Sequence, residues 1–143
     1  MEELHISMVA ILVAVVANFF LGFLWYTPLF GKAWAKEMGF DISVKPPGGA
    51  IAKGMIFMVI GNFFMAYVFA HNMAAWSFVP DSAAMSASEN ILSSAGFTWL
   101  GFYLPVDLGV VTWERKSWKL FGINTSYHFL MLLVAALILT YMK

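Results

Sequence analysis

Four long apolar runs constrain this chain more than any other feature of its sequence. They cover about residues 6–26, 54–76, 87–113 and 123–142. A helix needs roughly 20 residues to cross the hydrocarbon core of a bilayer, and each run is long enough to do so. With 62% hydrophobic and only 11% charged residues, a soluble domain could not bury so much apolar surface. The pattern predicts an all-α integral membrane four-helix bundle that forms a single transmembrane domain over residues 1–143.

Local signals mark the beginnings of the first and third runs. The first run is longer than the apolar core of a signal peptide and no small-x-small cleavage site follows it, so we interpret it as a retained membrane helix. The third run is preceded by Ser86, with Glu89 three residues later. That spacing predicts a capping box, in which each side chain bonds the backbone amide of the other residue.

The cations are distributed unequally among the loops. Seven of the eight lie between runs one and two or between runs three and four: Lys32, Lys36, Lys45, Lys53, Arg115, Lys116 and Lys119. The other is Lys143, and the chain begins with the acidic residues Glu2 and Glu3. The positive-inside rule therefore places both cation-rich loops in the cytoplasm and both termini outside.

The first loop has a helical pattern of its own. Its apolar residues share one helical face, with the lysines off that face: Phe30, Ala33, Trp34 and Met38. This predicts a short interfacial helix that ends at Gly39, followed by a turn over 45–49. Four aromatic residues near this side are expected to anchor the chain at the membrane interface: Trp25, Tyr26, Trp113 and Trp118.

Small and polar residues recur every four positions in the first two runs. The faces they form are Ala10, Ala14, Asn18 and Gly22 in the first run, and Asn62, Ala66 and Ala70 in the second. Membrane helices associate through such small residues and through hydrogen bonds between helices. Asn18 and Asn62 are expected at nearly the same depth, where they can bond each other.

The third run contains a proline and an acidic residue. Pro105 cannot donate a hydrogen bond to the carbonyl of Gly101, which predicts a kink. Asp107 follows, and Tyr103 lies one turn before it on the same face. A carboxylate at membrane depth is costly unless it is paired, protonated or hydrated. Its candidate partners are His128, Asn124 and Lys53.

The fourth run begins with polar residues that admit more than one interpretation. In one, Asn124 caps the helix and Lys53 holds Asp107, so that the polar residues only pack. In another, the polar residues of the cytoplasmic half form an inward-facing pocket for a proton or a polar ligand: Asp107, His128, Tyr103, Asn124, Tyr127, Asn18 and Asn62. A third is ligation of a pigment or haem by a histidine.

Several kinds of chemistry find no support in the sequence. There is no cysteine, which excludes disulfides and thiolate metal sites. No nucleophile–base pair, established metal motif or glycine-rich phosphate loop appears, so we expect no enzyme, no metal and no cofactor. The net charge is zero and no basic pattern is present, which argues against nucleic acid as a partner.

Two functions from different classes fit these observations. The first is a small binding or transport module with the cytoplasm-facing pocket described above. The second is a non-catalytic accessory subunit that packs into a larger membrane complex or a homo-oligomer. In both, the lipid bilayer is the main partner.

Four sequence blocks resemble a known family. They are GFLWYTPLFGKAW (22–34), MAYVFAH (65–71), GFTWLGF (96–102) and INTSYHF (123–129). They are similar to the bacterial four-helix membrane family called domain of unknown function 1761. The resemblance implies a small multi-pass protein of the bacterial inner (plasma) membrane, and it implies no particular activity.

Overall fold

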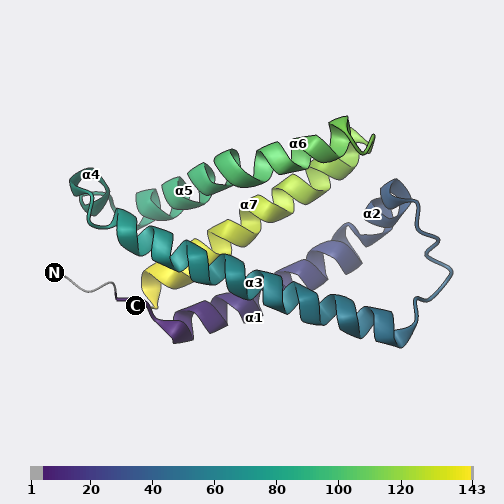
Figure 1. The fold of residues 1–143 in the computed structure, drawn as a ribbon, viewed down its shortest axis with the longest axis horizontal. Helices are drawn as coiled ribbons and strands as arrows, with labels where there is room; N and C mark the ends of the chain where they lie inside the picture. Colours follow the sequence, from purple (N-terminus) through teal and green to yellow (C-terminus); the bar gives the residue numbers. More distant parts are fainter. Residues whose placement is uncertain (1–4, 143) are drawn as a thin grey trace.

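The computed structural model describes residues 5–142, which are almost entirely helical (Figure 1). The elements in chain order are α1 (Met8–Leu24), η1 (Trp25–Leu29), α2 (Gly31–Met38), α3 (Gly48–Trp76), α4 (Pro80–Ala83), α5 (Ala87–Thr98), η2 (Trp99–Tyr103), α6 (Leu104–Thr112) and α7 (Trp118–Tyr141). Both η segments are π-helical. The all-α prediction is confirmed for these residues. Glu2, Glu3 and Lys143, which entered the charge argument, lie outside them.

Three helical stretches are long and apolar enough to cross a membrane: Met8–Leu29, Gly48–Trp76 and Trp118–Tyr141. The remaining predicted run, 87–113, is also helical, but it is divided into α5, η2 and α6. The division falls just before Pro105, where the sequence predicts a kink. The chain therefore has the helices of a membrane protein.

Two helices begin before the spans predicted for them at about 54–76 and 123–142. The second helix begins at Gly48 rather than at residue 54, so Gly48 and Gly49 belong to the helix and not to a turn. The last helix begins at Trp118 rather than at residue 123. Its N-cap is Ser117, whose hydroxyl accepts a hydrogen bond from the Leu120 amide at 3.1 Å.

Other local predictions are confirmed. The short helix of the first loop is α2, and Gly39 ends it in the left-handed conformation at φ 77°, which glycine adopts without steric cost. The capping box is present at the start of α5. There the Ser86 hydroxyl accepts from the Glu89 amide at 3.3 Å, and Glu89 accepts from the Ser86 amide at 2.9 Å.

Helix α7 lies at the centre of the bundle. It packs against α1 on one side and against α5 and α6 on the other, while α3 crosses α1 (Figure 1). The buried core is rich in alanine, which allows close approach of the helices: Ile11, Ala14, Val15, Ala66, Phe69, Ala70, Ile91, Ala95, Leu132, Ala135 and Ala136. All members of the two small-residue faces predicted in the first two runs are buried.

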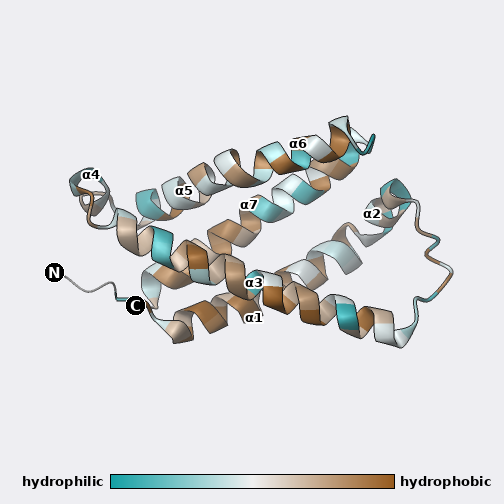
Figure 2. Ribbon diagram, viewed as in Figure 1, coloured by the Kyte–Doolittle hydropathy of each residue, from teal (hydrophilic) through white to brown (hydrophobic). Residues whose placement is uncertain are grey.

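The bundle has two ends of different character. The loop end comprises α2, residues 39–47, the start of α3 and the turn at 113–117, and the termini end comprises α4 and the described chain ends (Figure 1). The Ser117 hydroxyl donates to Glu37, which joins the first loop to the turn at 113–117. The seven loop cations therefore gather at the loop end. Figure 2 shows further hydrophilic positions on α6 and on the adjacent half of α7.

Candidate functional site

Two π-helical segments shape the loop-end half of the bundle. In η1 the Phe30 amide bonds the Trp25 carbonyl at 2.8 Å, and in η2 the Leu104 amide bonds the Trp99 carbonyl. A proline accompanies each segment: Pro28 lies inside η1, and Pro105 lies just after η2. A π-turn absorbs the mismatch that a proline creates in a helical ladder, and such turns are frequent at functional sites.

The segment η1 directs two aromatic donors at α7. The Trp25 indole N–H donates to the Ile123 carbonyl at 3.0 Å, and the Tyr26 hydroxyl donates to Asn124 Oδ1 at 2.9 Å. Both aromatic residues are partly buried. The interpretation of Trp25 and Tyr26 as membrane anchors alone is therefore incomplete. Their hydrogen bonds also connect η1, which continues α1, to α7.

The segment η2 approaches α7 from the other side. The Trp99 indole N–H lies 3.0 Å from both the carbonyl and the hydroxyl oxygen of Thr125, and Thr125 is buried. Residues 123–125 of α7 therefore receive aromatic hydrogen bonds from both π-helical segments. This interaction holds the polar stretch of α7 in place between α1 and α5.

Asp107 and His128 form a direct hydrogen bond. His128 Nδ1 lies 2.8 Å from Asp107 Oδ2. The Asp107 side chain is only 7% exposed, whereas the His128 side chain is 26% exposed. Of the three partners predicted for the carboxylate, the structure selects His128. Lys53 instead places its Nζ 6.0 Å from the ring centre of Phe57.

Aromatic rings surround this pair. The His128 ring centre lies 4.9 Å from that of Tyr103 and 5.7 Å from that of Tyr127. Tyr127 in turn lies 5.0 Å from Tyr26, ring centre to ring centre. The polar cluster is defined by these contacts and consists of Asp107, His128, Tyr103, Tyr127, Tyr26 and Asn124. Five of its members are predicted site residues, and Tyr26 joins them.

Asn18 does not bond Asn62, so that part of the prediction is wrong. Asn18 is fully buried, and its side-chain amide donates to the Met131 carbonyl of α7 at 3.2 Å. Its Oδ1 makes no hydrogen bond within residues 5–142. Asn62 is also buried, on the neighbouring α3. The two asparagines therefore lie in the helix packing, and Asn18 connects α1 to α7.

Tyr127 extends the polar cluster toward α1. A Cβ atom placed on Gly22 would lie 3.0 Å from the Tyr127 hydroxyl oxygen. Gly22 lies one turn after Asn18 on the same buried face, so the Tyr127 hydroxyl reaches the face of α1 that packs in the bundle. Glycine at position 22 provides the space for this contact.

The interpretation of Asn124 as a helix cap is wrong. Because α7 begins at Trp118, Asn124 lies in its second turn, and its side chain accepts a hydrogen bond from Tyr26. The sequence analysis also missed Trp99 and Thr125. A tryptophan shortly before a proline in an apolar helix is the signal that both π-helical segments share.

No group of three or more histidine, aspartate or glutamate side chains gathers as metal ligands would in the described part of the chain. His71 Nδ1 lies 2.8 Å from the Tyr67 carbonyl oxygen of its own helix. The chemistry available at the polar cluster is therefore that of a hydrogen-bonded carboxylate and imidazole beside phenol hydroxyls. These groups can hold a proton or bind a polar molecule.

Comparison with known proteins supports the family resemblance noted in the sequence. The sequence model of a family described as "Protein of unknown function (DUF1761)" matches residues 9–140, which includes both π-helical segments and the polar cluster. No curated protein and no solved structure matches the chain. The chain belongs to the DUF1761 family.

Proposed function

We propose that this chain is a multi-pass protein of the bacterial inner membrane with four spans and with both termini on the extracytoplasmic side. Two observations support this topology. The α5–η2–α6 path runs beside α7, which is itself long and apolar enough to cross a membrane (Figure 1). The seven loop cations share the loop end, which the positive-inside rule assigns to the cytoplasm.

The polar cluster is the functional site in this proposal. It acts as a binding or transport site that takes a proton or a polar ligand from the cytoplasmic side, without catalysis. One observation carries the proposal: the buried Asp107 carboxylate is bonded to an imidazole that is itself partly exposed. An ionisable residue inside a membrane bundle is costly, and it marks ion or substrate pathways more often than it adds stability.

The geometry suggests how the pair works. His128 bonds Asp107 through Nδ1, and its other ring nitrogen makes no hydrogen bond within residues 5–142. An imidazole can accept a proton or a ligand hydrogen at one nitrogen while it donates from the other. His128 therefore connects the exposed side of the cluster to the buried carboxylate. Tyr103 and Tyr127 flank the ring and restrict its orientation.

Reconstitution into liposomes tests this proposal. Proton flux is followed with an entrapped pH-sensitive dye in the wild type and in the Asp107→Asn and His128→Ala variants. Asp81→Asn and His71→Ala are matched controls because both residues lie outside the polar cluster. The proposal expects both cluster variants to lose flux and both controls to keep it. Equal flux in all five proteins would contradict it.

One observation favours a second candidate, an accessory subunit of a larger membrane assembly. Helix α3 is poorly covered by the rest of the protein. Only 11% of its apolar 18-residue stretch is buried, and every residue from 48 to 57 is exposed. Other helices can cover this surface as readily as lipid can. Size-exclusion chromatography with light scattering in a gentle detergent separates the candidates, because a uniform monomer without partners argues against a subunit role.

A further inference from the structure

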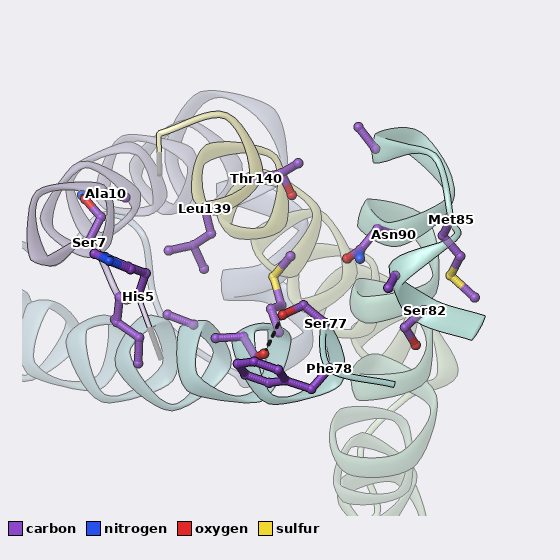
Figure 3. Close-up of a pocket in the computed structure, with 16 residues that line it drawn as sticks. His5, Ser7, Ala10, Ser77, Phe78, Ser82, Met85, Asn90, Leu139 and Thr140 are labelled. Atoms are coloured by element: carbon purple, nitrogen blue, oxygen red, sulfur yellow. Dashed lines mark hydrogen bonds between the residues drawn. The ribbon is translucent and has the colours of Figure 1, made fainter. Parts of the chain in front are cut away.

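The termini end contains a cavity that the proposed function does not use. Its volume is about 800 Å³, and it lies between the starts of α1 and α5, the ends of α3 and α7, and α4 (Figure 3). This volume is within the usual range for small-molecule sites, roughly 300–1,000 Å³. The cavity is at the opposite end of the bundle from α2 and the turn at 113–117 (Figure 1). It is therefore a separate site.

Among residues 5–142, the cavity lining carries no aspartate, glutamate, lysine or arginine, and its one ionisable side chain is that of His5. Small side chains contribute much of the wall and keep the space open: Ala10, Ala70, Ala74, Ala83 and Ala87. Methionine, leucine and phenylalanine side chains complete the apolar part. An ionic ligand would lose part of its hydration here without meeting a carboxylate, an ammonium or a guanidinium group. The lining therefore favours an uncharged molecule with an apolar body.

The polar groups of the lining differ in whether they already have partners. The Ser7 hydroxyl accepts from the Ala10 amide, and the Ser77 hydroxyl donates to the Ala74 carbonyl, the bond drawn in Figure 3. Thr140 Oγ1 is different, because it is shielded from solvent and makes no hydrogen bond within residues 5–142. An unpaired buried hydroxyl is unfavourable, and a ligand group in the cavity can pair with this one if the Thr140 side chain turns toward the space.

Asn90 provides a second polar group in the cavity lining. Its Oδ1 accepts from the Ser94 hydroxyl at 3.2 Å, which fixes the orientation of the amide group. Figure 3 shows Asn90 and Thr140 on the same side of the cavity, with Leu139 beside Thr140. A ligand hydroxyl or carbonyl at this side would meet polar groups while the rest of the ligand contacts alanine.

We propose that the cavity binds an uncharged amphiphile, with its hydroxyl or carbonyl group at Thr140 and Asn90 and its apolar body against the alanine-lined wall. The site lies beyond the polar cluster and requires no change there. The molecule can arrive from the bilayer or from water, since the cavity opens at an end of the bundle. The shared chemistry, a neutral polar group on an apolar body, is the same for both sources.

Photolabelling of the wild-type protein in lipid nanodiscs tests the proposal directly. The probes are diazirine-bearing alkyl chains of equal length that end in a hydroxyl, a trimethylammonium or a sulfonate group. We expect the hydroxyl probe to label the cavity-lining segments 70–90 and 139–140 about tenfold more than either charged probe, which corresponds to about 1.4 kcal/mol. Equal labelling by all three probes would overturn the proposal.

Variants provide a second, independent arm. Ala74→Phe fills the cavity, whereas Ala75→Phe is a matched control at the next residue, which is exposed and does not line the cavity. The proposal requires loss of hydroxyl-probe labelling in the first variant only. A fourth probe of equal length with a methyl end group should label the wild type less than the hydroxyl probe does, and Thr140→Val should remove this difference. If the hydroxyl probe labels the Ala74→Phe variant as strongly as the wild type, the cavity is not the binding site.

A short and a long hydroxyl probe distinguish the two sources of the ligand. Labelling by a short, water-soluble chain indicates entry from water, and labelling by a long chain alone indicates entry from the bilayer. Either result supports the site. The absence of labelling with both chain lengths contradicts it.

Discussion

The polar side chains at the two ends of the bundle differ in their hydrogen-bond partners. Toward the loop end, Asp107 is bonded to His128 and Asn124 is bonded to Tyr26, so polar groups meet one another directly. At the termini end, polar side chains surround a cavity, and the Thr140 hydroxyl has no partner within residues 5–142. Polar groups therefore bind helices together at one end and surround a cavity at the other.

The largest expected effect concerns the paired carboxylate. Asp107→Ala leaves the His128 imidazole without its partner in the packed bundle, and we expect unfolding to become easier by about 3 kcal/mol. The measurement is an SDS titration in mixed micelles followed by circular dichroism. The control is Asp81→Ala, because Asp81 is exposed on α4 at the other end. Equal stability of the two variants would remove the contrast between the ends.

The second effect concerns the turn between η1 and α2. A Cβ atom on Gly31 would lie 2.7 Å from the Tyr26 carbonyl oxygen, so Gly31→Ala forces the backbone to shift. We expect a loss of about 2 kcal/mol in the same titration. Gly96→Ala in α5 meets no atom within 4 Å and should instead stabilise the helix by about 0.5–1 kcal/mol. A neutral Gly31→Ala would show that this turn is not tightly packed.

The smallest effect compares one substitution at two sites on α7. Thr125→Val removes an acceptor of the Trp99 indole, although the Thr125 carbonyl remains, and should cost about 1 kcal/mol. Thr140→Val removes a buried hydroxyl that has no partner within residues 5–142 and should stabilise the empty protein by about 1 kcal/mol. Thermal unfolding in detergent measures both. Melting temperatures that shift in the same direction in both variants would contradict the difference between the two ends.

The helices and their buried faces were predictable because they follow from local rules. The spacing of Ala10, Ala14, Asn18 and Gly22 identifies a helix face without knowledge of its partner. The depth of Asp107 limits its partners to a few residues, of which His128 is one. The hydrophobic periodicity of a helix and the position of a charged residue within an apolar run can both be read from the sequence alone.

The remaining features depend on three-dimensional geometry. Trp25 and Trp99 begin the π-turns at 25–29 and 99–103 and direct their indoles at α7, and no pattern in the sequence specifies that direction. The start of α7 does not follow from hydropathy, because residues 118–122 combine a lysine and a glycine with apolar residues, while the cap is Ser117. The cavity is a gap between the ends of several helices, which has no sequence pattern.

The most direct test of the Asp107–His128 pair is nitrogen-15 NMR of the histidine side chains in nanodiscs. His71 provides an internal reference, because its Nδ1 bonds the Tyr67 carbonyl of its own helix. The pair at 2.8 Å predicts that Asp107→Asn shifts the imidazole resonances of His128 and leaves those of His71 unchanged. His128 resonances that are identical in the wild type and the variant would contradict the pairing and the function proposed from it.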